Sequence, residues 1–424
     1  MESLDVLIIG LNYAPEPAGI APYTTGLANG LAARGHRVRV LTGLPHYPQW
    51  AITPGYEGGR VYTATTGKPE VVHLVHHVPP PNSLRGRLRM ELSYGRRVAS
   101  VRWGSPDVVV CVSPALLATR LAIARAKSVR RRPGIGIWVQ DLYGVGASET
   151  GILGSRAGSA LAAVEGEVLR SADRLAVIHE RFKTRVVADL GIAPDKVSVI
   201  KNWTHVGPSD PALQADARRR LGWGSDEIVA LHAGNMGVKQ GLENVIAAAS
   251  LAQSHSARVR FVLIGDGNQR TKLELLSRGV DRVELVSPLP DDEYLAALAA
   301  ADVLLVNEKP GVGEMAVPSK LTSYFTSGNP VVAATGLDSI TAAEVKSSGA
   351  GLVVAPDDPA ALLAAVARLG NDRELAGRLG RAGVEYFHRT LSMVSAIDEF
   401  EQWIRQLAPA PLRSPANHER LIGQ

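Results

Sequence analysis

Residues 228–241 read IVALHAGNMGVKQG, an apolar run followed by two glycines, a lysine and a further glycine. This order is typical of a buried parallel strand, a tight loop and the start of a helix. The run VLIIG at 6–10 opens a similar series near the N-terminus, where the loop includes Gly19 and a helix is expected from Tyr23. Two such starts predict two α/β domains.

Further β-branched runs follow each start, separated by stretches rich in alanine and leucine. The alternation predicts two doubly wound parallel sheets with crossover helices, that is, two Rossmann-like domains facing a cleft. The further runs are 37–41, 71–75, 107–112, 136–140, 174–178 and 197–201 in the first half, and 260–264, 283–286, 302–306, 330–334 and 351–355 in the second. Helices are expected at 23–34, 84–102, 116–131 and 242–252.

Domain boundaries follow from composition. The polar stretch 202–211 contains Pro and Gly without periodicity, which is typical of a linker. We therefore predict an N-terminal domain over 1–205 and a C-terminal domain over 206–392. Apolar residues at helical spacing predict a helix over 393–407 that packs back on the N-terminal domain, and a flexible tail over 408–424.

The charge of the 424-residue chain is unevenly placed. The whole chain has 46 Lys+Arg and 41 Asp+Glu, a net charge of +5. Residues 1–205 hold 25 basic and 15 acidic residues, or +10, which leaves 21 and 26, or −5, for the remainder. The first half is therefore expected to face an anionic partner.

Cysteine usage and hydropathy limit the compartment. The one cysteine, Cys111, lies in an apolar run and predicts a buried, unreactive thiol. The N-terminus lacks a basic segment followed by an apolar signal core, and no uncharged apolar run reaches the ~18–20 residues that a membrane-spanning helix needs. We expect a cytoplasmic protein, peripheral on the inner face of the plasma membrane.

Three loops have the composition of phosphate sites. Gly19 precedes the first helix, Lys239 follows the glycines of the second domain, and Ser319 is placed to cap a helix that begins beside Pro318. Lys320 in the first turn of that helix opposes the helix dipole unless an anion is bound there. Ordinary strand-to-helix loops with exposed lysines are the alternative interpretation of each.

These residues, in this order and spacing, resemble retaining glycosyltransferases of family 4, which have the GT-B fold, and in particular the colanic-acid-biosynthesis type. The resemblance extends to about residue 406. It is carried by the motifs NYAPE (12–16), GIAPY (19–23), GHRV (35–38), PHYPQW (45–50), PDV (106–108), VQDL (139–142), IKNW (200–203), GNMGVKQG (234–241), GDG (265–267) and PSKL (318–321).

The resemblance implies a UDP- or GDP-sugar donor held mainly by the second domain and an acceptor held mainly by the first. Transfer with retention, without a metal or other cofactor, is expected. The residues implied for catalysis are Lys239, Asp141 and Glu314. Those implied for donor binding are Gly19, Gly234, Asn235, Gly237, Gly265, Asp266, Pro318, Ser319, Lys320 and Leu321. Those implied for the acceptor are Asn12, Tyr13, Glu16, His46, Tyr47 and Gln140.

The chain departs from the family pattern at several of these positions. The arginine that usually follows the first glycine of the donor loop is Asn235 here, and the lysine falls one position early, at Lys239. The second acid of the usual acidic pair falls at Ser323, and Glu314 stands next to the position of the first. Gln140 replaces a histidine. These replacements concern donor choice and sugar contacts.

The segment 84–102 is rich in arginine, and its leucines and Val98 give it an amphipathic pattern. We interpret it as a surface helix attracted to anionic lipid. A solvated helix is the alternative, and the absence of a recognised motif argues against nucleic acid. The arginines expected to face the membrane are Arg85, Arg87, Arg89 and Arg96.

The predicted function is transfer of a sugar from a nucleotide-sugar donor to a membrane-associated acceptor, a lipid-linked glycan, in polysaccharide or glycoconjugate biosynthesis. A nucleotide-sugar epimerase of the same fold is an alternative. A non-catalytic subunit that binds nucleotide-sugars is another. Release of an isomerised sugar from donor alone would identify the epimerase.

Overall fold

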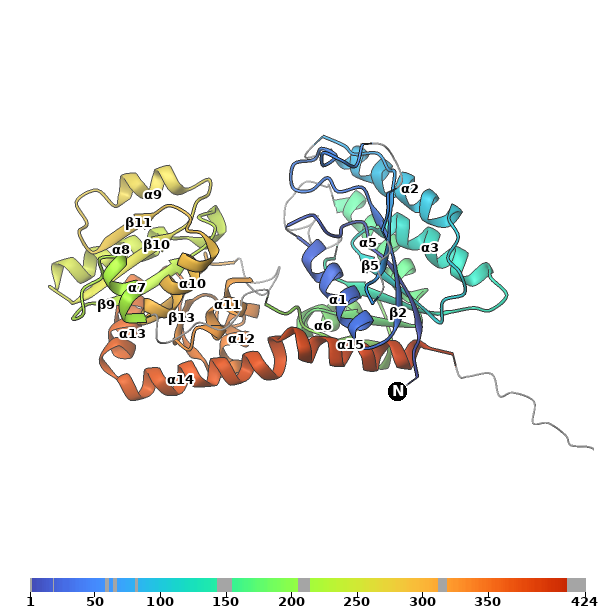
Figure 1. Ribbon diagram of the computed structural model, residues 1–424. Helices are drawn as coiled ribbons and strands as arrows, with labels where there is room; N and C mark the ends of the chain where they lie inside the picture. The colour runs from blue at the N-terminus through green and yellow to red at the C-terminus, as the bar shows by residue number, and fades with distance from the viewer. Residues whose placement is uncertain are drawn as a thin grey trace, which may run out of the picture. The chain divides into compact units, whose positions relative to one another are not determined.

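The computed structural model describes residues 2–17, 19–57, 61–63, 67–80, 83–142, 155–204, 214–311 and 319–409. Contacts divide the chain into two compact units, Met1–Ile200 together with Ile397–Gln424, and Lys201–Ala396. Each unit consists of one sheet with helices on both faces (Figure 1). The prediction of two Rossmann-like domains is confirmed.

The sheet of the first unit has the order β3-β4-β2-β1-β5-β6-β7-β8 and is parallel except at β3. All seven predicted runs form strands, and the antiparallel edge strand β3 is additional. The strands are β1 (Asp5–Ile9), β2 (Arg37–Gly43), β3 (Val61–Thr63), β4 (Glu70–Leu74), β5 (Val108–Ser113), β6 (Gly134–Val139), β7 (Arg174–Val177) and β8 (Val197–Val199). The helices are α1 (Ala21–Ala33), α2 (Leu84–Ser100), α3 (Leu116–Ser128), α5 (Ser155–Arg170) and α6 (Glu180–Ala188), with the 3₁₀ turn η1 (Pro194–Lys196).

The sheet of the second unit is entirely parallel, with the order β11-β10-β9-β12-β13-β14. Its strands are β9 (Ile228–Ala233), β10 (Val259–Ile264), β11 (Val283–Val286), β12 (Val303–Asn307), β13 (Val331–Ala334) and β14 (Gly351–Val354). Its helices are α7 (Gln214–Arg220), α8 (Glu243–Ser254), α9 (Arg270–Leu276), α10 (Asp291–Ala300), α11 (Ser319–Thr326), α12 (Ile340–Ser348), α13 (Pro359–Asn371) and α14 (Arg373–Tyr386), with η3 (Val238–Gln240) and the π-helical η4 (Phe387–Leu391). The carboxylates of Asp358 and Asp372 cap α13 and α14.

Both sheets reverse their strand order next to the first strand of the unit. In the first unit the reversal lies between β1 and β5, and in the second between β9 and β12. Loops on the two sides of such a reversal run in opposite directions and leave a crevice beyond the carboxyl ends of the strands, where α/β proteins bind ligands. The topology therefore gives each unit one preferred ligand edge.

The final helix, α15 (Met393–Leu407), ends in the first unit, where it packs against α1 and β6 (Figure 1). Phe400, Trp403 and Ile404 are buried, and the ring of Phe400 packs on Trp138 with centroids 4.7 Å apart. A Cβ on Gly136 would lie 2.4 Å from the Trp403 ring, so glycine is required in β6 for this close packing.

A charge cluster supports the same contact. The Glu401 carboxylate accepts hydrogen bonds from Arg405 at 2.7 Å and from Arg34 at 2.9 Å, and these bonds lower the pKa of Glu401 to about 2. Because a carboxylate with this pKa is ionised throughout the neutral range, the cluster ties α15 to the end of α1. In the described part of the chain, no helix has the length and apolar character needed to cross a bilayer.

Candidate functional site

In the second unit, two glycine loops pack backbone to backbone at the edge where the strand order reverses. The Gly234 N–H donates to Ile264 O and the Met236 N–H donates to Asp266 O, both at 2.8 Å. Gly234 and Gly265 have φ of +132° and +145°, and a Cβ on Gly265 would lie 1.9 Å from Gly234 O. Only glycine permits this contact, which keeps the backbone of the loop after β9 exposed at the ligand edge.

Lys320, in the first turn of α11, is half-buried and brings a desolvated cation to this loop. A Cβ on Gly234 would lie 3.6 Å from Lys320 Cε and 3.8 Å from Nζ, so the missing side chain leaves room beside the ammonium. Nζ donates to His232 Nε2 at 3.3 Å. None of the described carboxylates lies within 4.0 Å of Nζ. The cation thus has a neutral neighbour and no counter-ion among the described side chains.

Burial determines the protonation of both groups. It lowers the pKa of Lys320 to about 8, and the more distant Glu308 carboxylate opposes that shift. The His232 side chain is fully buried, so its pKa is well below the usual value, and the Lys320 charge lowers it further. Near neutral pH, Lys320 is therefore mostly charged and His232 neutral, with Nε2 as the hydrogen-bond acceptor.

Tyr324, one turn after Lys320, fixes the position of α11. Its hydroxyl accepts a hydrogen bond from the Ala233 N–H at 2.9 Å and is fully buried at the end of β9. Leu321, predicted for the donor, is also fully buried and packs in the core, so its side chain anchors α11. Ser323 donates to Lys320 O at 3.0 Å.

Two further side chains brace the loops, and sequence reasoning did not identify them. Asn307, at the end of β12, donates to Gln240 O at 2.8 Å and to Gly241 O at 2.9 Å. Arg270 donates to Gly265 O and to Val286 O. In the sequence, each is a polar residue that follows an apolar run or a loop. This pattern is too common to identify a functional residue.

The other donor-side residues predicted from the sequence have these positions. Asn235, Asp266 and Lys239 are exposed, Gly237 is half-buried, and the Asp266 carboxylate accepts from the Gly267 N–H at 2.7 Å. Lys239 lies in η3, and its carbonyl accepts from the Lys309 N–H. Glu314 and Pro318 lie outside the described residues, and of Ser319 only the backbone is described, as the first residue of α11.

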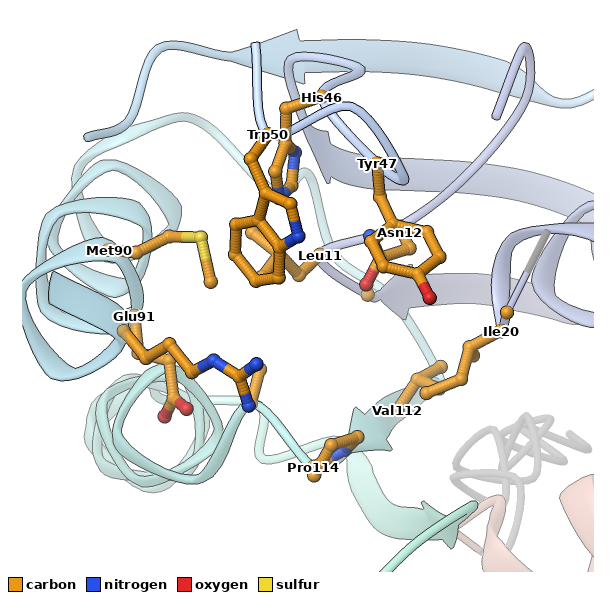
Figure 2. Close-up of a pocket in the computed structure, with 14 residues that line it drawn as sticks. Leu11, Asn12, Ile20, His46, Tyr47, Trp50, Met90, Glu91, Val112 and Pro114 are labelled. Atoms are coloured by element: carbon orange, nitrogen blue, oxygen red, sulfur yellow. The ribbon is translucent and has the colours of Figure 1, made fainter. Parts of the chain in front are cut away.

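The first unit has a pocket of about 300 Å³ at its own ligand edge. Loops after β1, β2 and β5 form three sides, and the first turns of α2 form the fourth (Figure 2). Asn12, His46 and Tyr47, predicted for the acceptor, line it, and so does Gly19, predicted for the donor. The lining also includes Trp50, Arg87, Met90 and Glu91, none of which was predicted for an acceptor.

Glu16 organises this pocket without lining it. Its Oε1 accepts from the backbone N–H groups of His46 at 2.8 Å and Tyr47 at 2.9 Å, and its Oε2 accepts from Asn12 Nδ2 at 2.8 Å. Glu16 is 5% exposed. A buried carboxylate with this many donors is a positioning group that holds two loops together.

Three other first-unit residues predicted from the sequence lie outside this lining. Tyr13 and Gln140 are buried, and burial raises the pKa of Tyr13 to about 12. Asp141 is exposed, yet neighbouring atoms desolvate its carboxyl group enough to raise its pKa, while the hydrogen bond from the Leu142 N–H acts in the opposite direction.

Helix α2 differs from the expected amphipathic surface helix. Met90, Tyr94 and Val98 are buried in the protein core, so the larger apolar face covers the sheet. Leu88 alone among the described large apolar residues of α2 is clearly exposed, at 42%. All four predicted arginines are exposed, but Arg87 belongs to the pocket lining.

Two family models and several known proteins match the chain. The model of the glycosyl transferase 4-like domain matches residues 18–203, and the model of glycosyl transferases group 1 matches residues 227–372. The putative colanic acid biosynthesis glycosyl transferase WcaI of Escherichia coli K12 is 29% identical over 95% of this chain and 100% of that protein. The D-inositol 3-phosphate glycosyltransferase of Acidothermus cellulolyticus is 30% identical over 69% of this chain and 60% of that protein.

Solved structures show the same fold. HepE from Anabaena, solved in complex with UDP, has a TM-score of 0.67 at 15% identity over 95% of this chain and 100% of that one. WaaG, a glycosyltransferase involved in lipopolysaccharide biosynthesis, has a TM-score of 0.62 at 18% identity over 94% and 99%. The chain therefore belongs to the GT-B glycosyltransferases that combine a glycosyl transferase 4-like domain with a group 1 domain, and its relatives include a putative glycosyltransferase of colanic acid biosynthesis.

Proposed function

We propose that the protein transfers a sugar, with retention and without a metal ion, from a UDP- or GDP-sugar to a lipid-linked glycan at the cytoplasmic face of the plasma membrane. The observation that carries the donor half is the desolvated Lys320 ammonium in the first turn of α11, beside the open backbone of Gly234. A cation near a helix N-terminus, with no described counter-ion, is favourable once an anion is bound between them. A nucleotide diphosphate supplies that anion.

The chemistry follows from the charges. As the bond to the anomeric carbon breaks, negative charge collects on the departing diphosphate, and Lys320, Lys239 and the amides at the start of α11 stabilise it. We assign Asp141 and Glu314 to the acceptor hydroxyl and the donor sugar. We infer front-face attack in which the diphosphate itself takes the hydroxyl proton, so that no glycosyl-enzyme forms.

Lys320 makes donor binding depend on pH. Its free-state pKa of about 8 means that raising the pH from 7 to 9 removes most of its charge before the nucleotide binds. Since the bound form requires the ammonium, the dissociation constant of UDP should rise about tenfold over this interval. Calorimetric titration at both pH values measures it. Lys320→Met should bind UDP weakly, with a dissociation constant that does not change between pH 7 and pH 9. If the dissociation constant of this variant rises as steeply as that of the wild type, a group other than Lys320 is responsible for the pH dependence.

The transfer reaction separates this proposal from other activities. UDP- and GDP-sugars are incubated with and without lipid-linked acceptor extracts, and NMR reports the anomeric configuration of the product. Acceptor-dependent release of UDP or GDP with retained configuration supports the proposal. Isomerised sugar from donor alone would identify an epimerase, and binding without turnover would identify a nucleotide-sugar-binding subunit.

The membrane part of the proposal rests on charge and on the exposed Leu88, because the larger apolar face of α2 is used inside the protein. Replacing Arg85, Arg89 and Arg96 together with glutamine should weaken sedimentation with anionic vesicles by about a hundredfold, at ~1 kcal/mol per arginine. The control replaces Arg278, Arg378 and Arg381, which are exposed in the second unit. Equal losses in both triple variants, or none in the first, would refute a membrane role for α2.

A further inference from the structure

The pocket of the first unit contains a cation stacked on an aromatic ring. The Arg87 guanidinium carbon lies 5.1 Å from the centroid of the Trp50 ring. Arg87 is exposed, and no carboxylate of the described residues lies within ion-pair distance, 4.0 Å, of it. Both side chains line the 300 Å³ pocket. The pocket therefore includes a positive group that is not neutralised within the described part of the unit.

The aromatic platform is held in place before any ligand binds. Trp50 has φ of +54°, a backbone conformation that non-glycine residues rarely adopt. The rings of His46 and Tyr47 meet the Trp50 ring edge-on, each with centroids 6.0 Å apart, and the indole points into the pocket (Figure 2). Glu16 fixes the same loop through two backbone N–H groups. A platform fixed in this way loses little conformational entropy on binding.

The hydrogen-bonding edge of the guanidinium is available to a ligand. The guanidinium carbon lies over the indole at 5.1 Å from its centroid, and the planar group's N–H donors match the paired oxygens of a phosphate or carboxylate. The acid in the same pocket, Glu91, is 2% exposed, and its Oε2 accepts from the Leu117 N–H at 2.9 Å, at the start of α3. Glu91 thus serves the helix terminus, while Arg87 faces the pocket.

We propose that Arg87, stacked on Trp50, binds an anionic group of the acceptor, a phosphate or a carboxylate on the glycan. The inference rests on the proposed function and specifies the class of acceptor that the first unit takes. It also separates Arg87 from Arg85, Arg89 and Arg96 on the same helix, since only Arg87 lines the pocket.

The test measures binding of charged and uncharged sugars to the full chain, without nucleotide and with UDP at saturation. The charged probes are the 1-phosphates of glucose, galactose, mannose and N-acetylglucosamine, and the methyl glycoside of glucuronic acid. Each is compared with the uncharged methyl glycoside of the corresponding sugar, which for glucuronic acid is glucose. With UDP bound, at least one charged probe should bind about tenfold more tightly than its neutral counterpart. Which probe it is distinguishes phosphate from carboxylate.

Arg87→Gln should reduce this preference to less than about twofold, and Arg87→Lys should restore part of it. Arg89→Gln is the matched control, because it removes the same charge from the exposed surface of α2 and should leave the preference unchanged. The inference fails if no charged probe is preferred, or if Arg87→Gln and Arg89→Gln lower the preference equally. The affinity for UDP is measured in parallel. If the wild-type chain does not bind UDP, the proposed function is contradicted. If it binds UDP but does not prefer a charged probe, only the anionic acceptor is contradicted.

Discussion

We expect replacement of Lys320 with methionine to lower the affinity for UDP by about a hundredfold at pH 7, roughly 2.7 kcal/mol. Methionine keeps the apolar stem that packs beside Gly234 and removes only the ammonium. In the proposed binding mode, the lost interaction is a charge-assisted hydrogen bond to the diphosphate in a largely desolvated site, where such bonds are strongest. Isothermal titration calorimetry with UDP measures the change.

Thermal unfolding distinguishes a binding role of Lys320 from a structural one. Burial lowers the pKa of Lys320 from 10.5 to about 8. At every pH below the pKa of this lysine in the unfolded chain, its charge therefore reduces the free energy of unfolding. Without ligand, Lys320→Met should therefore melt no lower than the wild type. Lys346→Met, on the exposed side of α12, is the control and should leave UDP binding unchanged. Unchanged UDP affinity in Lys320→Met would refute the assignment.

We expect replacement of Gly265 with alanine to destabilise the second unit by about 3 kcal/mol and to weaken UDP binding. The new Cβ would meet the Gly234 carbonyl oxygen at 1.9 Å, and φ of +145° is unfavourable for alanine. The two glycine loops must separate, and the loop after β9 then moves away from Lys320. Chemical denaturation and UDP titration measure the two effects.

Gly279→Ala provides the control for this substitution. Gly279 also has a positive φ, +79°, but a Cβ there would meet no atom within 4 Å. The Gly279→Ala substitution should lower the free energy of unfolding by only about 1–2 kcal/mol, through the backbone conformation alone, and should leave the affinity for UDP unchanged. Equal losses of stability in both variants would mean that the backbone conformation, rather than the contact with Gly234, determines the effect at Gly265.

The sheets were predictable from the sequence because their signals are local, and Lys320 attracted attention for a local reason as well. Strands buried on both faces require continuous apolar runs, as in the fully buried β5 and β9, and such runs are visible without any tertiary information. Lys320 was identified because its charge conflicts with the dipole of its own helix. The short antiparallel strand β3 has no such pattern and was not predicted.

The pocket of the first unit could not be predicted in the same way, because its groups are brought together by tertiary contacts. Trp50 and Arg87 come from different elements, and no spacing in the sequence connects them. The resemblance implies an acceptor contact for Glu16, and the structure places this residue beneath the loops that it holds together. Likewise, the apolar residues of α2 were interpreted as lipid-facing, whereas Val98 covers the protein's own sheet.

We propose that the Lys320 ammonium, at the carboxyl edge of the second sheet, holds the diphosphate of the sugar donor. A crystal structure of the protein with UDP would show this contact. We expect a diphosphate oxygen within hydrogen-bonding distance of Lys320 Nζ, about 3 Å, with the phosphates against the backbone of Gly234. A well-ordered nucleotide bound elsewhere, with Lys320 Nζ still in contact only with His232, would contradict it.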